Sequence, residues 1–117
     1  MGTRFVSSIE SPVHDNFKDS IKSAGTDGTY ILNKSSKPVI RALKTEFTKD
    51  IYENGSMSMG DLAKIKDLYF GGDMNAAPAL AGQSSGLINE IKSVKSIIDE
   101  TISEYNEVCL RLSKDLF

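Results

Sequence analysis

The stretch Met1-Gly2-Thr3-Arg4-Phe5-Val6 opens the chain, and it is the motif that indicates the fold most strongly. Gly2 has no Cβ, so a phosphate can come close to the main-chain N–H groups beside it. The hydroxyl of Thr3 adds a further hydrogen-bond donor at the same place. The apolar pair Phe5-Val6 follows and opens an apolar run. By itself this stretch is a weak signal, and it becomes informative together with motifs further along the chain.

Several short motifs follow the opening stretch. Val13-His14 and Phe17-Lys18 come soon after it, and Gly72-Asp73 precedes Ala81-Gly82-Gln83 and Gly86-Leu87-Ile88. Together these residues resemble the family of FMN-dependent nitronate monooxygenases (2-nitropropane dioxygenases) and enoyl-ACP reductase II enzymes, which are TIM-barrel flavoenzymes. The resemblance covers nearly the whole chain, but it corresponds only to the C-terminal third of that family.

The resemblance implies roles for two pairs of residues. The backbone of Gly2 and Thr3 is expected to hold the FMN phosphate, at the end of the last barrel strand. The resemblance therefore implies a strand over residues 1–6. Gly82 and Gln83 are expected to return to the mouth of the barrel, where the Gln83 amide can donate and accept hydrogen bonds in the active-site wall. The family's catalytic histidine lies upstream of the Gly-Thr-Arg-Phe motif, so no catalytic residue is expected here. His14 is expected to be a surface or capping residue, with a position facing the flavin phosphate as the alternative.

The length of the chain limits the architecture. A complete (β/α)₈ barrel takes about 250 residues, and this chain has 117. We therefore expect a helix-rich α+β fold that is the C-terminal part of a TIM-barrel flavoenzyme, with the barrel incomplete. Residues 1–10 would be the last barrel strand and phosphate loop, 11–83 a small α/β lobe, and 84–117 C-terminal helices that pack on the barrel. Truncation, a split gene or an internal start at Met1 would each give such a chain.

Composition narrows the class of protein. Charged residues make up 26% and hydrophobic residues 39% of the chain, as in ordinary globular domains. The net charge of −2 argues against a nucleic-acid partner, and no apolar run approaches the ~20 residues of a membrane span. The single cysteine, Cys109, indicates a cytoplasmic protein without an internal disulfide, and its place on an apolar helix face predicts a buried, inert thiol. No Cys-x-x-Cys or His-Glu-x-x-His motif supports a metal site.

Local patterns in the first half predict a helix and a strand. Ser11-Pro12 is typical of a helix start, and it predicts a helix over residues 12–24. Val13, Phe17 and Ile21 would lie on one face of this helix. Residues 29–32 are apolar and β-prone, which predicts a strand.

The segment after Pro38 has two interpretations. Residues 39–43 fit the second strand of a hairpin, and their spacing also fits the start of a helix with Pro38 at its first position. The family resemblance favours a strand that runs into a helix over residues 44–52. Arg41 is expected to pair with a carboxylate.

The second half is expected to be helical on both sides of a Gly/Ala-rich loop. Asp61 is expected to cap a short helix, Ser84 or Ser85 a helix through Ile91, and Ser93 a long helix from residue 94 to about 113. In the loose segment 53–60, Met57 and Met59 are expected to fill gaps in the core.

One face of the long C-terminal helix is apolar throughout. Such a stripe predicts association, either with the missing N-terminal barrel portion or with another copy of the chain. Its members are Val94, Ile97, Ile98, Ile102, Tyr105, Val108, Cys109 and Leu112.

Two classes of function therefore follow from the sequence. The first is the C-terminal segment of an FMN-dependent oxidoreductase that acts on a nitronate or an enoyl thioester; the chain alone is expected to be inactive. The second is a noncatalytic helical module that self-associates or binds a partner through residues 94–112.

Overall fold

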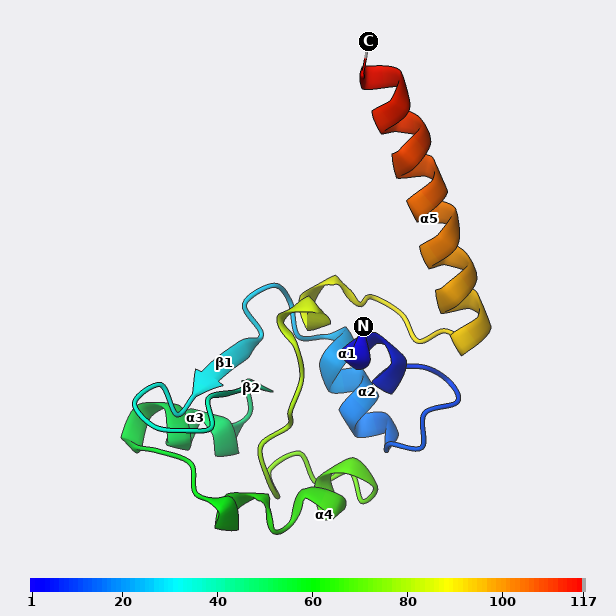
Figure 1. The fold of residues 1–117 in the computed structure, drawn as a ribbon. Helices are drawn as coiled ribbons and strands as arrows, with labels where there is room; N and C mark the ends of the chain where they lie inside the picture. The colour runs from blue at the N-terminus through cyan, green and yellow to red at the C-terminus, as the bar shows by residue number, and fades with distance from the viewer. Residues whose placement is uncertain (117) are drawn as a thin grey trace.

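A two-stranded hairpin lies beside the helix α3 (Glu46–Asn54) on one side of the body, the other short helices lie away from it, and one long helix leaves this body and ends far from it (Figure 1). The structure is a computed structural model that describes residues 1–116. The elements in chain order are α1 (Gly2–Val6), α2 (Asp15–Lys22), β1 (Thr29–Leu32), β2 (Ile40–Leu43), α3 (Glu46–Asn54), the 3₁₀ turn η1 (Met59–Leu62), α4 (Ile65–Tyr69), the 3₁₀ turn η2 (Gln83–Leu87) and α5 (Val94–Asp115). The predicted helix-rich α+β class is confirmed.

The opening residues form a helix, so the prediction of a strand over residues 1–6 was wrong. The Phe5 N–H donates to the Met1 carbonyl at 3.3 Å, and the Ser7 N–H donates to the Thr3 carbonyl at 3.1 Å. A strand needs a neighbouring strand to satisfy its backbone groups. The sheet described in residues 1–116 contains β1 and β2 alone, whereas a helical turn satisfies part of this backbone from within.

Helix α2 begins at Asp15, three residues later than Ser11-Pro12 predicted. His14 is its N-cap: the Nδ1 atom accepts a hydrogen bond from the Asn16 N–H at 3.0 Å. The His14 N–H donates to the Tyr69 carbonyl, which ties this segment to the end of α4 and keeps it out of the helix. The imidazole lies against Gly72, where an added Cβ would be 2.5 Å from Nδ1. The capping role expected of His14 is therefore confirmed.

The hairpin expected around residues 29–43 is confirmed, with Thr29 opposite Leu43 and Leu32 opposite Ile40. The following helix, α3, begins at Glu46 rather than residue 44, because the Thr45 side chain caps it by accepting from the Thr48 N–H. Within residues 1–116, Arg41 pairs with no carboxylate. Its guanidinium donates to the Thr29 hydroxyl across the two strands at 2.8 Å.

The core is built around a segment of small residues between α4 and η2. Ala77 and Ala79 are fully buried. The Leu43 N–H donates to the Ala79 carbonyl at 2.8 Å, and the Ala81 N–H donates to the Arg41 carbonyl at 3.3 Å, so this segment runs beside β2. Small side chains allow a backbone to pass this deep inside the protein. The buried apolar cluster comprises Phe17, Ile21, Leu43, Leu68, Ala77, Ala79 and Ile88.

Three predictions for the second half were wrong in detail. Asp61 does not cap a helix: it lies inside η1, where its carboxylate accepts from the Ser58 N–H at 2.8 Å. The helix expected through Ile91 is only the turn η2, because Gly86 packs so closely on residue 25 that an added Cβ would be 2.4 Å from the Gly25 carbonyl oxygen. Met57 fills the core as expected, whereas Met59 is 73% exposed.

The long helix α5 is capped by Ser93 as predicted, with the Ser93 Oγ accepting from the Ser96 N–H. Ile97 in its first turn is buried against the body, but the apolar residues beyond it are exposed. Cys109 is exposed as well, so the prediction of a buried thiol was wrong. The apolar face that was to bury Cys109 has no covering element among the described residues, because α5 points away from the body (Figure 1).

Asn33 holds the segment after α3 in place, and its replacement should destabilise the fold. Asn33 is buried at φ 61°, its amide donates to the Met57 carbonyl at 3.2 Å, and its side-chain oxygen accepts from the Met57 N–H. Asn33→Ala should lower the free energy of unfolding by about 2–4 kcal/mol, since it loses these bonds and strains the left-handed backbone. Urea denaturation followed by circular dichroism measures this change.

The control is Asn33→Gly, which loses the same hydrogen bonds but accepts a positive φ. It should be about 1 kcal/mol more stable than Asn33→Ala. Wild-type stability of both variants would contradict the role given to Asn33.

Candidate functional site

The structure brings together the two motifs that the sequence separates most widely. The Thr3 Oγ1 accepts a hydrogen bond from the Gly82 N–H at 2.8 Å, across 79 residues of chain. Gly82 has little room for a side chain, since an added Cβ would be 3.3 Å from Thr3 Oγ1. The first turn of α1 and the start of η2 therefore lie side by side.

The first turn of α1 has donors that can meet an anion. The first N–H groups of any α-helix have no acceptor within the helix, and in α1 these belong to Gly2 and the residues beside it. A Cβ added at Gly2 would meet no atom within 4 Å, so the backbone there is open to approach. Because Thr3 Oγ1 accepts from Gly82, the hydroxyl proton of Thr3 stays available for donation to a ligand.

Gln83 is exposed at the start of η2, directly after Gly82. Its side chain lines a surface hollow together with Thr26, Ser84 and Leu87. The amide can thus reach a molecule that lies against this face of the protein. His14, by contrast, is occupied as the cap of α2 and lies against Gly72.

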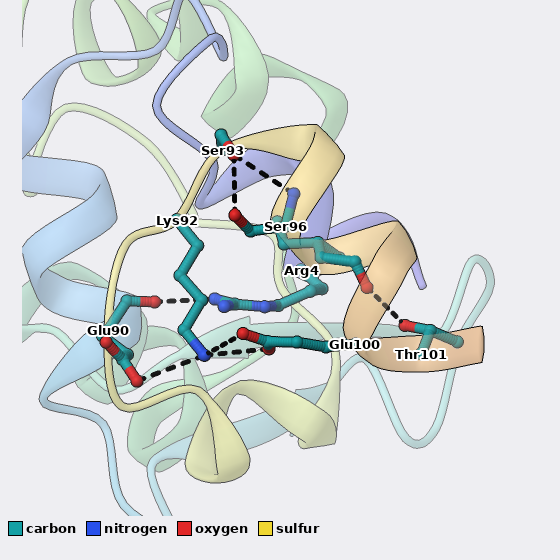
Figure 2. Close-up of polar contacts among 8 residues, drawn as sticks. Arg4, Glu90, Lys92, Ser93, Ser96, Glu100 and Thr101 are labelled. Carbon is teal, nitrogen blue, oxygen red and sulfur yellow. Dashed lines mark hydrogen bonds and ion pairs between the residues drawn. The ribbon is translucent and has the colours of Figure 1, made fainter. Parts of the chain in front are cut away.

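A second polar cluster joins α1 to the base of α5, and Figure 2 shows it. The Arg4 guanidinium donates to the Glu90 carbonyl at 2.7 Å. The Lys92 Nζ lies 2.8 Å from the Glu100 carboxylate and 3.2 Å from the Glu90 carboxylate. We call these four residues the α5 clamp. Sequence reasoning missed it, because Arg4 and Glu90 are 86 positions apart and no local spacing links them.

Backbone contacts support the α5 clamp from the other side. The Ile9 N–H donates to the Lys92 carbonyl at 2.9 Å, and the Glu10 carboxylate accepts from the Val94 N–H at 2.9 Å. The pKa of Lys92 is raised, chiefly because its ammonium donates a hydrogen bond to the Glu100 carboxylate and secondly because it donates one to the Glu90 carboxylate. Lys92 is therefore protonated and paired at neutral pH, and residues 1–10 fix the direction in which α5 leaves the body.

Two further kinds of feature concern the part of the chain that the structure describes: a metal site and a membrane span. In residues 1–116, no three His, Cys, Asp or Glu side chains group so that they could hold a metal ion. Nor does any helix within that range combine the length and the apolar character that a membrane crossing requires.

The comparisons with known proteins identify the class. Residues 1–104 match the family model described as nitronate monooxygenase. Two solved structures of FabK from Thermotoga maritima are similar, one of the protein and one of a mutant. Their identities to this chain are 33% and 34%, with TM-scores of 0.86 and 0.85. Each match covers 99% of this chain, but only 39% and 36% of the FabK chains.

The chain belongs to the nitronate monooxygenase family. This result confirms the resemblance to nitronate monooxygenases and to enoyl-ACP reductase II enzymes that the motifs indicated. The chain spans between a third and two fifths of the length of the FabK structures, and its fold matches that part of them.

The α5 clamp predicts a pH-dependent stability. Lys92→Met removes the cation between Glu90 and Glu100, so the variant should unfold at lower urea concentration than the wild type at pH 8. A raised lysine pKa contributes stability below its ordinary value of 10.5 and loses it as the pH rises through the folded-state value. The difference between the two proteins should therefore shrink above pH 10.5, as measured by circular dichroism. Lys66→Met, at an exposed lysine of α4, should show no such difference at pH 8.

Proposed function

We propose that this chain is the C-terminal part of an FMN-dependent oxidoreductase of the nitronate monooxygenase and enoyl-ACP reductase II type. In this proposal Gly2 and Thr3 bind the FMN phosphate, and Gly82 and Gln83 form part of the active-site wall. The observation that carries it is the hydrogen bond from the Gly82 N–H to Thr3 Oγ1, since it brings the two motifs side by side. Membership of the family supports the choice of cofactor.

The residues present fit a phosphate group. A phosphate is an anion that accepts several hydrogen bonds, and helix N-termini attract such groups. Gly2 leaves its backbone open to approach, and the Thr3 hydroxyl keeps a proton to donate. Arg4 is not needed as a direct ligand, because its guanidinium donates to the Glu90 carbonyl and holds α1 in position.

When bound, FMN would supply the transfer of electrons between substrate and acceptor. The residues of this chain would anchor the phosphate and shape one wall, while the catalytic base and the walls around the flavin ring come from the barrel portion. Nitronate oxidation and enoyl thioester reduction both fit, because Gly82 and Gln83 offer backbone and amide groups that select neither substrate. We expect the chain alone to show no turnover, because the barrel portion supplies the catalytic base. We also predict a cytoplasmic location.

The Thr3 hydroxyl can be tested directly with FMN and with riboflavin, which lacks the phosphate. In amide NMR spectra of the 117-residue chain, FMN should shift the signals of residues 2–4 and of Gly82, and riboflavin should leave them in place. Thr3→Val should weaken FMN binding by about ten- to hundredfold, since a hydrogen bond to a charged group contributes roughly 1.5–3 kcal/mol.

Thr3→Ser is the matched control, because it keeps the hydroxyl and should bind FMN nearly as the wild type does. Equal shifts with riboflavin, or equal losses in both variants, would contradict phosphate binding at this site.

The noncatalytic module stays the alternative function. The exposed apolar residues of α5 favour it, since an uncovered face of this kind indicates an interaction surface. Absence of any FMN-induced shift, together with self-association of the chain, would support this alternative over the oxidoreductase.

A further inference from the structure

The hairpin concentrates positive charge in a chain that is otherwise acidic. Residues 28–45 have four basic side chains and no acidic one. The whole chain has 14 basic and 16 acidic side chains, so the remaining residues have 10 and 16, a formal charge of −6. Such an asymmetry of charge within one domain marks a surface that attracts an oppositely charged molecule. The basic residues of the hairpin are Lys34, Lys37, Arg41 and Lys44.

Two stacked tyrosine rings hold two of these lysines in place. Tyr30 of β1 and Tyr52 of α3 stack with ring centroids 4.3 Å apart and planes 15° apart. The Lys44 Nζ lies over the Tyr30 ring, 5.0 Å from its centroid, and the Lys34 Nζ lies over the Tyr52 ring, 5.3 Å from its centroid. A ring attracts an ammonium without cancelling its charge. We call these four residues the hairpin stack.

Carboxylates of the chain leave this charge largely uncancelled. In residues 1–116, the carboxylate within ion-pair reach of either lysine is that of Asp27, 3.8 Å from the Lys44 Nζ. The side chain of Asp27 is 95% exposed, and such an exposed pair contributes little. The carboxylates of α3 pair with neither lysine in the same part of the chain. The hairpin stack therefore presents two ammonium groups that can meet an outside anion.

A hollow of about 550 Å³ lies beside the hairpin stack, between the end of β1 and the end of α3. Ammonium and hydroxyl groups donate hydrogen bonds, and a carboxylate accepts several of them. The lining of the hollow thus extends the donors of the stack to a second place where a carboxylate can bind. This lining includes Lys34, Tyr52, Ser35, Ser36 and Ser56, together with apolar side chains of β1 and α3.

We propose that the hairpin stack and the hollow beside it bind an acidic segment of another protein, with carboxylates of that segment at Lys34 and Lys44. Complementary charge of this kind speeds the encounter of two proteins and orients them. The strands β1 and β2 and the helix α3 lie on the side of the body opposite α5 (Figure 1). The proposed phosphate site lies instead at α1 and η2, so the binding of an acidic protein does not depend on the flavin.

An acidic protein segment fits this surface better than a nucleic acid does. Proteins that bind single strands stack the bases on free aromatic faces. The rings of Tyr30 and Tyr52 are instead stacked on each other, and each has an ammonium over it. A long polyanion would also meet the −6 charge of the rest of the chain, whereas a short acidic segment covers the hairpin alone.

The first test uses fluorescently labelled poly-L-glutamate and the 117-residue chain. Fluorescence anisotropy at low ionic strength should show binding that weakens as salt is added, because salt screens exposed charges. The double variant Lys34→Glu with Lys44→Glu should bind at least about tenfold more weakly, since four units of charge change at the site. Its far-ultraviolet circular dichroism should match the wild type, because both side chains are exposed.

The matched control is Lys66→Glu with Lys114→Glu, at exposed lysines of α4 and α5. It changes the net charge by the same amount but leaves the hairpin intact, so its affinity should stay within about threefold of the wild type. An equal loss in both double variants would show that binding follows the net charge alone and would overturn the proposal. Absence of binding to the wild type would overturn it as well.

The second test locates the contact and compares the two kinds of polyanion. In amide NMR spectra, poly-L-glutamate should shift the signals of residues 34–36 and 44 and leave those of residues 2–4 and 82 in place. Shifts confined to other parts of the chain contradict the assignment. An oligodeoxythymidine with the same number of charges should bind more weakly than poly-L-glutamate. Equal or tighter binding would assign the hairpin to a nucleic acid and overturn the proposal.

The outcome of these tests is separate from that of the flavin experiments. The variant Lys34→Glu with Lys44→Glu should keep any FMN-induced shifts of residues 2–4, because its substitutions lie on the hairpin. A chain that binds poly-L-glutamate at the hairpin and shows no FMN shift would contradict the proposed flavin site alone.

Discussion

The hydrogen bond between Thr3 and Gly82 is the contact on which the arrangement of this chain depends. It joins the first helical turn to the start of η2, which comes after all but one residue of the buried core cluster. The start of η2 reaches Thr3 because the alanine-rich segment before it is buried beside β2 and bonded to it at Ala79 and Ala81. The position of Gly82 is thus set by the core, and the position of Thr3 is set by Gly82.

The short helix α1 acts as a connector between two elements. Thr3 contacts the start of η2, while Arg4, the next residue, reaches the carbonyl of Glu90 just before α5. Successive residues of an α-helix point about 100° apart, so one helical turn can serve both neighbours. Any ligand that lies against Gly2 would therefore contact the element that also fixes the direction of α5.

Most helices of this chain are too short to be stable by themselves, since isolated helices under about 12–15 residues are marginal in water. Side-chain caps compensate at α2, α3 and α5, through His14, Thr45 and Ser93. Such a cap typically contributes about 1 kcal/mol. Polar side chains thus help to hold these helices in place beside the apolar core.

The sequence by itself indicated the family, the strand at residues 29–32, the start of α5 after Ser93 and the apolar face along that helix, but it left residues 39–43 open between a strand and a helix. These features follow from motifs and from local periodicity. Both involve residues that are close together in the chain, so they can be recognised without knowing any distant contact. Only the tertiary structure decided that α1 is a helix, that His14 rather than Ser11 starts α2, and that Arg4 joins Glu90. Each of these depends on a contact between residues far apart in the chain: α1 lies against η2, and His14 is held by Tyr69 and Gly72. Local spacing contains no information about such contacts, because the fold and not the neighbouring sequence brings the partners together.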